Sequence, residues 1–329
     1  MENPKILYLN GAQIESLKLD YKQYAACIEK SFTYRGEGKT EMPPKWGLNP
    51  AESSLMHAMP ASVAGDINAA GIKWISMYGL NPTRGFPAVQ GLIILNDVKT
   101  GAPQAIMDCK LVTEKRTAAA GVMAAKYLAF DDAKAMAIIG IGRVGLQHFV
   151  ASIELLPHIK HYYLFDLYPS SVENAKKLIA TLPTPLPEIT YCASPEEAVK
   201  NADIILTAIS MTKEINPCIK KEHMKEKVTF ISQDYDAAFA ADCFATADEF
   251  IVDDTKQYQE TKNKGPNFKD YPMEPDADMG SIMSKKYEPK KGIKRRGIAF
   301  LGIATHDIIT AKLVYDKAKE LGTGTMLDI

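Results

Sequence analysis

An apolar strand that runs into a glycine-rich turn and then a helix is the feature that most narrows the fold of this 329-residue chain. The segment AMAIIGIGRVGLQHF places Gly140, Gly142 and Gly145 in the spacing G-x-G-x-x-G. The motif alone is weak evidence, but between a strand and a helix its glycines allow a tight turn and let backbone N–H groups approach a pyrophosphate. The segment therefore predicts a dinucleotide-binding βαβ unit.

The chain around this motif alternates between short apolar runs and helical stretches, from AMAIIG to EFIVDD. Such alternation is typical of a doubly wound parallel sheet. We therefore expect an α/β protein with a Rossmann NAD-binding domain over residues 119–304.

An acidic residue ends the second predicted strand of this domain. Asp166 closes HYYLFD, 26 residues after Gly140, where a carboxylate can accept hydrogen bonds from the adenosine ribose and would repel a 2′-phosphate. This favours NAD over NADP as the cofactor. The residues expected to contact NAD are Gly140, Gly142, Arg143, Val144, Gly145, Asp166 and Thr207.

The sequence before the Rossmann pattern predicts strands instead. Residues 54–110 contain four apolar runs separated by turn signals such as NPTRGFP and NDVKTGAP, which indicates an antiparallel sheet or meander. Residues 16–35 predict a helix, Thr113 is a plausible N-cap for an Ala-rich helix, and residues 303–322 predict a final amphipathic helix. We expect a mixed, strand-rich substrate-binding and dimerisation domain formed by residues 1–118 plus 305–329.

Residues 256–296 are polar, with several Pro, Gly and charged residues. The favoured interpretation is a solvated connection with one short helix, and the alternative is a mobile flap near the active site.

Composition excludes several classes of function. The formal net charge is −1, which does not favour nucleic-acid binding. There is no apolar run long enough for a membrane span, and the N-terminal residues lack a signal pattern. The five cysteines are scattered and never form C-x-x-C, which argues against a disulfide framework or a metal site and predicts a cytoplasmic protein.

One strand carries an unusual residue. If GIKWISMY is extended, Lys73 shares a face with Ile75 and Met77, while Trp74 points the other way. A lysine on an apolar face needs a partner or a function, because burying an unpaired charge is costly. A partly buried lysine can polarise a carbonyl or an imine, and arginine commonly binds carboxylates, so Lys73, Lys45 and Arg116 stand out as candidate site residues.

Several segments together resemble the ornithine cyclodeaminase/μ-crystallin family. They are MPPK, MHAMPAS, GIKWIS, GLIILNDVKTGAPQAIMD, TEKRTAAAGVMAAKYLA and IIGIGRVG, in that order. The resemblance runs from about Lys39 to the last helix. It implies an NAD(P)-dependent homodimer that acts on a small molecule with an amino or imino group beside a carboxylate.

The resemblance also implies roles for individual residues. Lys45 and Arg116 match the positions that hold the substrate carboxylate, and Lys73 matches the catalytic lysine. An active-site aspartate is expected in VTFISQDYDAAF, as Asp236 or, second, Asp234. The family usually has Gly and Pro around that aspartate, and this chain has neither.

One departure from the family bears on the substrate. Ornithine cyclodeaminases have a glutamate, which holds the distal amine, where this chain has His57. The preferred prediction is therefore a substrate-binding His57 in an NAD-dependent amino-acid dehydrogenase or ketimine reductase. The alternatives are an ornithine cyclodeaminase that forms L-proline and ammonia, and a non-catalytic ligand-binding protein of the μ-crystallin type.

Overall fold

The computed structural model describes residues 5–210 and 216–328. The chain divides into two compact units, which we describe separately. The discontinuous unit contains residues 1–116 and 303–329, and the central unit contains residues 117–302. Within the described ranges, no helix combines the length and apolar character that a membrane span requires.

The discontinuous unit is built on a mixed sheet of eight strands. The order is β16-β1-β7-β6-β5-β4-β2, β3 also pairs with β4, and every pair is antiparallel except β1 with β7. The antiparallel meander expected over residues 54–110 is confirmed by β4 to β7. The strand bounds are β1 Lys5–Leu9, β2 Thr40–Glu41, β3 Trp46–Leu48, β4 Ser54–Val63, β5 Ala69–Tyr78, β6 Val89–Asn96, β7 Pro103–Asp108 and β16 Thr325–Asp328.

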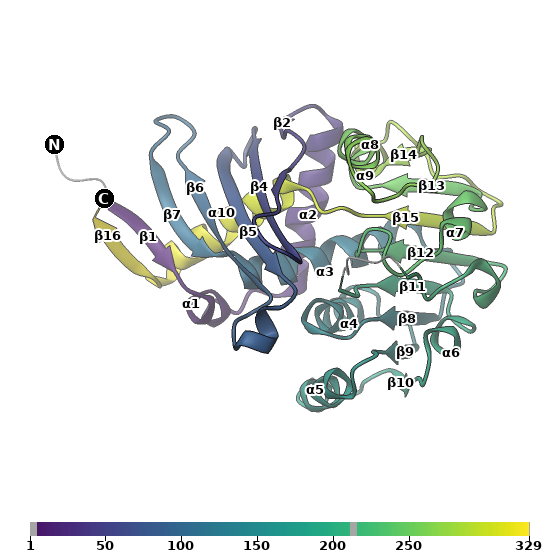
Figure 1. Ribbon diagram of the computed structural model, residues 1–329. Coiled ribbons are helices and arrows are strands. Elements are labelled where there is room, and N and C mark those ends of the chain that lie inside the picture. Colours follow the sequence, from purple (N-terminus) through teal and green to yellow (C-terminus); the bar gives the residue numbers. More distant parts are fainter. Residues whose placement is uncertain (1–4, 211–215, 329) are drawn as a thin grey trace. The chain divides into compact units, whose positions relative to one another are not determined.

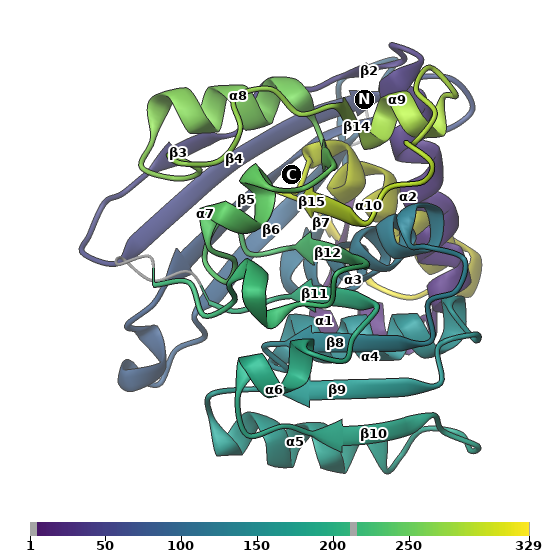
Figure 2. The same cartoon turned by 90° about the vertical axis from the view of Figure 1, so that its right-hand side faces the viewer.

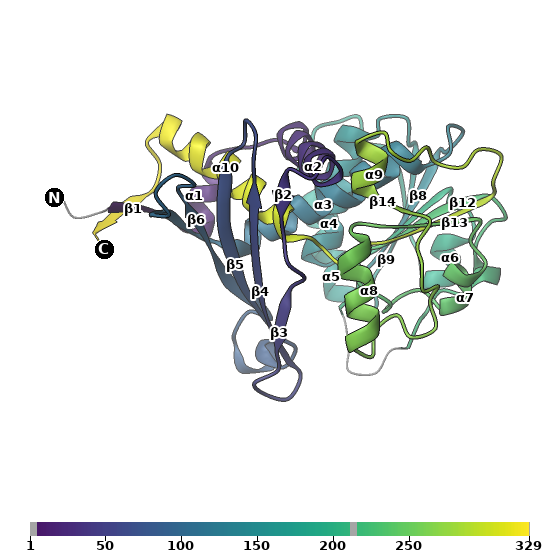
Figure 3. The same cartoon turned by 90° about the horizontal axis from the view of Figure 1, so that it is seen from above.

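Helices cover one face of this sheet. Helix α10 (Ala304–Leu321) packs against β4, β5 and β6 and against α2 (Tyr21–Gly36), and Figure 3 shows it passing behind these strands. The covered face buries Met59, Ile75 and Ile93, so period-2 alternation decides which side chains enter the core. The unit also contains α1 (Gly11–Ser16) and the 3₁₀ turn Asn81–Arg84.

Two helix predictions are wrong at their N-termini. The helix expected over residues 16–35 begins only at Tyr21, as α2, because Lys18 adopts a left-handed backbone (φ 51°) and Asp20 caps α2 in a capping box with Gln23. Helix α3 (Cys109–Leu128) begins before Thr113, which therefore lies inside the helix and is not its N-cap. The carboxylate of Asp108 accepts a hydrogen bond from the Lys110 N–H at that terminus (2.7 Å).

The central unit contains a parallel sheet of eight strands in the order β10-β9-β8-β11-β12-β15-β13-β14. Figure 2 shows β10, β9, β8, β11 and β12 side by side in this order. The strand bounds are β8 Ala135–Ile139, β9 His161–Phe165, β10 Glu188–Tyr191, β11 Ile204–Thr207, β12 Val228–Ser232, β13 Glu249–Val252, β14 Ala277–Asp278 and β15 Arg295–Ala299.

Helices lie on both sides of this sheet: α4 and α5 on one, α6 and α7 on the other (Figure 1). The predicted doubly wound α/β sheet is therefore confirmed. Because β9 and β11 flank β8 on opposite sides, the strand order reverses at β8, which is where dinucleotides bind in such sheets. The helix bounds are α3 Cys109–Leu128, α4 Arg143–Leu155, α5 Pro169–Ile179, α6 Pro195–Val199, α7 Ala241–Ala245, α8 Thr255–Lys264 and α9 Met279–Met283, with a 3₁₀ turn at Lys221–His223.

The interpretation of residues 256–296 as a solvated connection is wrong. The segment contains most of α8, all of β14 and α9, and three buried aromatic rings, Tyr258, Phe268 and Tyr271, that join the core of the central unit. The Lys262 ammonium donates hydrogen bonds to the carbonyl oxygens of Lys269 (2.9 Å) and Tyr271 (2.8 Å), which fixes the loop after α8. Charged residues are scattered through this segment and dominate its average composition, so composition alone does not reveal these buried aromatic residues.

Candidate active site

Lys73 lies on the helix-covered face of the sheet in the discontinuous unit. It pairs in register with Met59 of β4 and Ile93 of β6, and its side chain is only 1% exposed. Trp74 points to the other face and is 38% exposed. The predicted alternation is confirmed, and the lysine is fully buried.

The buried lysine has a partner that the sequence analysis missed. Asp307, in the first turn of α10, is completely buried and places Oδ2 2.8 Å from Lys73 Nζ. Its Oδ1 accepts a hydrogen bond from Arg116 Nε at 2.9 Å. The fold thus brings together a strand residue, a residue of α3 and a residue of the last helix.

This cluster of Lys73, Arg116 and Asp307 has unequal charges. With Lys73 protonated, it holds two positive charges and one negative charge, and all three side chains are at most 6% exposed. Buried charge is stabilised only when it is paired, so an excess positive charge favours binding of an anion. A substrate carboxylate has the required charge and can engage an arginine through two oxygens.

Burial also lowers the pKa of Lys73, and the nearby Arg116 adds to this effect. The negative charge of Asp307 acts in the opposite direction. A lysine under these opposing influences is suited to exchanging a proton during a reaction.

His57 lies on the same face as Lys73 because it lies two residues before Met59 on β4, and Met59 is the direct cross-strand partner of Lys73. Burial, together with the charges of Lys45 and Lys73, lowers the pKa of His57 to about 3, so the imidazole is neutral at physiological pH. The cross-strand partner of His57 is Gly47 in β3, where a Cβ would lie 3.3 Å from the imidazole. The predicted residues Lys45, His57, Lys73 and Arg116 therefore all belong to the discontinuous unit.

The glycine motif lies in the central unit, between β8 and α4. Gly140 has φ +84°, and a Cβ on it would lie 2.7 Å from the Ala208 carbonyl oxygen. A Cβ on Gly145 would lie 1.7 Å from the Gly140 oxygen, whereas one on Gly142, the N-cap of α4, would meet open space. The first and third glycines are thus sterically required. Arg143 and Val144 begin α4, so the open side of Gly142 and the start of this helix can accommodate a pyrophosphate.

Asp166 follows β9 directly and holds this loop. Its Oδ2 accepts a hydrogen bond from the Ile141 N–H and its Oδ1 accepts one from the Tyr168 N–H, each at 2.9 Å. Each carboxylate oxygen can still accept a further bond, because it has a second lone pair. The residue is therefore placed beside the glycine turn, where the sequence predicts contact with ribose.

Thr207 ends β11 and binds one of the two candidate aspartates. Asp234 is 4% exposed, and its carboxylate accepts hydrogen bonds from Thr207 Oγ1 (2.8 Å), Ser232 Oγ (2.9 Å) and the Ile209 N–H (2.9 Å). Burial raises the pKa of Asp234 to about 6 although these hydrogen bonds act to lower it.

Asp236, the first choice from the sequence, has different partners. Its Oδ1 accepts a hydrogen bond from Asn267 Nδ2 (2.8 Å) and its Oδ2 accepts one from the Phe268 N–H (2.6 Å). Tyr235, between the two aspartates, has a left-handed backbone (φ 60°). Asp236 thus anchors the loop after α8, and Asp234 lies at the carboxyl ends of the parallel strands.

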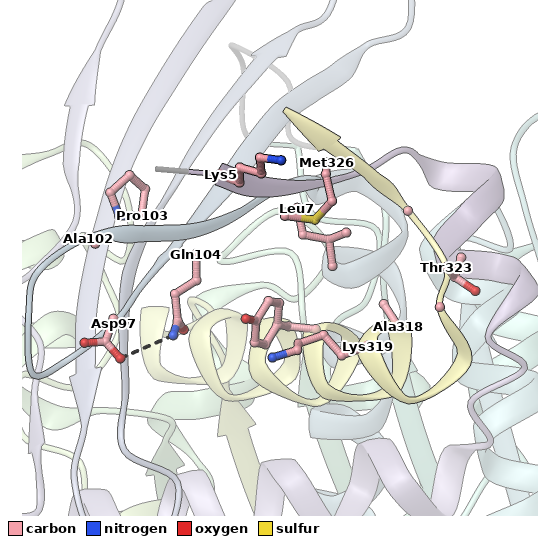
Figure 4. Close-up of a pocket in the computed structure, with 13 residues that line it drawn as sticks. Lys5, Leu7, Asp97, Ala102, Pro103, Gln104, Ala318, Lys319, Thr323 and Met326 are labelled. Atoms are coloured by element: carbon pink, nitrogen blue, oxygen red, sulfur yellow. Dashed lines mark hydrogen bonds between the residues drawn. The ribbon is translucent and has the colours of Figure 1, made fainter. Parts of the chain in front are cut away.

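A separate cavity of about 560 Å³ lies in the discontinuous unit, between the last turns of α10 and the sheet edge (Figure 4). Its lining includes Leu7, Gln104, Tyr315 and Met326 and none of the predicted site residues. Asp307 lies eight residues before Tyr315 on α10, a separation of about 12 Å along a helix. This cavity is therefore distinct from the Lys73 cluster.

The chain is similar over nearly its whole length to several known proteins. The chain is 28% identical over 344 aligned residues to an N-((2S)-2-amino-2-carboxyethyl)-L-glutamate dehydrogenase of Staphylococcus aureus, covering 99% of each protein. It is similar in structure (TM-score 0.83, 26% identity, 97% and 99% coverage) to a Δ1-pyrroline-2-carboxylate reductase of Thermococcus litoralis in complex with NADH and L-proline. It is also similar (TM-score 0.85, 25% identity, 99% and 100% coverage) to an archaeal alanine dehydrogenase dimer with bound NAD.

A family model decides the classification. The model of the ornithine cyclodeaminase/mu-crystallin family matches residues 7–322, which include the whole central unit, most of the discontinuous unit and every predicted site residue. The resemblance found in the sequence motifs is confirmed. The chain belongs to the ornithine cyclodeaminase/mu-crystallin family.

Proposed function

We propose that this protein is an NAD-dependent oxidoreductase that acts on an α-amino or α-imino acid through an imine. The observation that carries this proposal is the buried cluster of Lys73, Arg116 and Asp307, with its excess positive charge. An amino acid supplies a carboxylate for the cations and a nitrogen for proton exchange with lysine. The similar reductase and dehydrogenases are named for substrates of this kind.

The residues of the central unit fit NAD. The turn from Gly140 to Gly145 leaves the start of α4 open to a pyrophosphate, and Asp166 lies beside it, where a negative charge disfavours a 2′-phosphate. NAD, when bound, supplies or accepts the hydride at the substrate Cα. We assign Gly140, Gly142, Arg143, Val144, Gly145, Asp166 and Thr207 to cofactor binding.

The chain's own residues bind the substrate and move protons. Arg116 and Lys45 hold the carboxylate, and Lys73 exchanges a proton with the imine nitrogen or with attacking water. An aspartate after β12 assists at the amine or the water. Asp236 remains a candidate, but the raised pKa and the strand-end position of Asp234 make Asp234 the stronger one.

His57 favours net redox chemistry over cyclodeamination. In a cyclodeaminase, the distal amine of ornithine attacks the imine, ammonia leaves and the hydride returns. A neutral imidazole stabilises a distal ammonium less than a carboxylate does, and the pKa of His57, lowered to about 3, keeps this group neutral.

We also propose that two copies associate through the outer face of the mixed sheet, by which we mean the face opposite the one that α10 covers. Trp46, Ala58, Trp74 and Leu92 are successive partners across β3, β4, β5 and β6 and so form one row. The two tryptophans and Leu92 are 78%, 38% and 44% exposed, and apolar surface of this kind marks an interaction site. The cytoplasm is the proposed location, in keeping with five free cysteines.

The test begins with purified protein and two assays. The first follows oxidation of NADH with Δ1-pyrroline-2-carboxylate, and separately with pyruvate plus ammonia. The second supplies a trace of NAD⁺ with excess L-ornithine and measures proline and ammonia. NADH oxidation that is lost in Lys73→Ala supports the proposal. Proline and ammonia far in excess of the NAD⁺ would establish a cyclodeaminase instead, and NADH binding without turnover in either assay would indicate a binding protein.

A further inference from the structure

Asp307 contacts both cations of the proposed site, each through a different oxygen. We propose that Asp307 is a positioning residue that fixes the Lys73 ammonium and the Arg116 guanidinium in one geometry for the substrate, an inference that rests on the proposed function. The carboxylate does not need to touch the substrate for this role. It acts through the two side chains that do.

The start of α10 is itself held in place, which makes Asp307 a rigid support. Thr305 Oγ1 accepts a buried hydrogen bond of 2.9 Å from Ser31 of α2. The His306 ring packs edge-on against Phe32, with ring centroids 4.4 Å apart. Two consecutive residues therefore fix this turn against α2, and the next residue carries the carboxylate.

The choice of atoms in the ion pair suits carboxylate binding by Arg116. Asp307 engages Nε, so this ion pair does not use the two terminal amino groups, Nη1 and Nη2. Arginine binds carboxylates through two parallel N–H donors of its planar fork. Fixing Nε also fixes the plane of the guanidinium, which reduces the rotational freedom lost when a substrate binds.

Asp307 also supplies the negative charge that the lysine requires. The ionisable groups that act most strongly on Lys73 are Asp307 from α10 and Arg116 and Cys109 from α3. Lys73 in turn acts on His57 of β4 and on His306 of α10. Burial lowers the pKa of both histidines and raises that of the Cys109 thiol to about 12, so these three groups are neutral near pH 7. In this set, Asp307 provides the negative charge that favours the protonated form of Lys73 beside Arg116.

The experiment compares Asp307→Asn and Asp307→Glu with the unaltered full-length protein. The substrate is whichever amino or imino acid the unaltered protein turns over best. We expect Asp307→Asn to lower kcat about 100-fold and raise KM about 10-fold, because both proton transfer and carboxylate binding lose their alignment. Asp307→Glu restores the negative charge, so its kcat and KM should lie between those of Asp307→Asn and those of the unaltered protein. The part of the pH–rate profile that reflects ionisation of Lys73 should move to lower pH in Asp307→Asn. Loss of packing alone would not cause this shift.

Asp316→Asn is the matched control. It makes the same change on the same helix, where Asp316 is half-exposed and pairs with Lys312. Its kcat and KM should stay within twofold of the unaltered protein, and all variants should bind NADH equally in a fluorescence titration. Values of kcat and KM within threefold for a folded Asp307→Asn would overturn the proposal. If that variant is insoluble, unchanged kinetics in Asp307→Glu would overturn it.

A second measurement separates this inference from the proposed function. In ¹⁵N-labelled protein, a buried and ion-paired lysine should give an ammonium NMR signal at neutral pH, which Lys73→Met identifies by its loss. We expect the signal to disappear in Asp307→Asn and to persist in Asp316→Asn. If the unaltered protein turns over none of the substrates, the proposed function fails, and this signal still tests Asp307. An unchanged signal in Asp307→Asn would overturn the positioning role.

Discussion

The hydroxyl of Thr207, the last residue of β11, donates a 2.8 Å hydrogen bond to Oδ1 of Asp234, two residues beyond β12. The two neighbouring parallel strands are thereby joined at their carboxyl ends, at a buried acid. The pKa of this acid is raised from its ordinary 3.8 to about 6, chiefly by burial. The proton state of Asp234 therefore changes in a pH range that is accessible to experiment.

Asp234 should make stability depend on pH. The folded protein holds the Asp234 proton more tightly than the unfolded chain, so its contribution is complete below pH 3.8 and is lost as the pH rises through about 6. Between pH 4.5 and 7, this corresponds to a loss of about 2 kcal/mol in the free energy of unfolding. In urea denaturation over the same pH range, the free energy of unfolding of Asp234→Asn should fall by about 2 kcal/mol less than that of the unaltered protein. An identical pH dependence in the two proteins would contradict the raised pKa.

Lys73 should be required for turnover but not for cofactor binding. Lys73→Ala removes the proposed proton-exchange group, and we expect kcat to fall by at least about 100-fold. NADH affinity should change less than twofold, because the glycine turn belongs to the central unit. Steady-state kinetics and a fluorescence titration measure the two effects. Lys110→Ala, at a partly exposed lysine, serves as the control, and substantial activity in Lys73→Ala would refute the assignment.

His57 should influence which substrate is accepted. His57→Glu places a carboxylate where ornithine cyclodeaminases have one, so it should raise kcat/KM for L-ornithine relative to alanine about 10-fold. His57→Gln changes the shape similarly without adding charge and should not produce this shift. Because the pKa of His57 is about 3, His57→Gln should also leave the shape of the pH–rate profile unchanged between pH 5.5 and 8. If His57→Glu and His57→Gln changed this kcat/KM ratio equally, His57 would not determine which substrate is accepted.

Asp166 should set the preference for NADH. Its charge repels a 2′-phosphate, so Asp166→Ser should reduce the ratio of NADH to NADPH affinity about 10-fold. The carboxylate also accepts a hydrogen bond from the Ile141 N–H, and Asp166→Asn, which keeps an acceptor oxygen, tests that structural role separately. Competitive binding titrations with both cofactors give the ratios. Tight binding of NADPH by the unaltered protein would contradict the prediction.

The exposed row on the outer sheet face should hold two copies together. We expect light scattering to give the mass of two chains for the unaltered protein and of one chain for Trp74→Glu or Leu92→Glu, because a buried unpaired carboxylate is costly. Leu167→Glu is a control, since Leu167 is 75% exposed and lies in the central unit. A single-chain mass for the unaltered protein would refute the proposed dimer.

Features with a local pattern were the ones that could be predicted from the sequence. Alternation along β5 placed Lys73 on the buried face, and the spacing of Gly140 to Gly145 identified a turn whose steric requirement lies within a few residues. Both depend on neighbours close in the chain, so the sequence contains the necessary information.

The parts that could not be predicted depend on distant contacts. In the sequence, Asp307 is only an acidic residue near the predicted start of a helix, and nothing near it indicates its partner Arg116, which lies 191 residues away. The partners of Asp234 and Asp236 are likewise set by other strands and loops, so the choice between two aspartates in QDYD was open. The burial of Phe268 in a charged segment follows from the same cause, since composition averages over isolated core residues.

The division of the chain also bears on how the discontinuous unit folds. Residues 117–302 are contiguous, whereas the discontinuous unit combines residues from both sides of them. Helix α10, which supplies Asp307, and β16, which covers the edge of β1, lie beyond the central unit in the sequence. Pairing the charge of Lys73 therefore requires closure of a loop that contains the whole central unit.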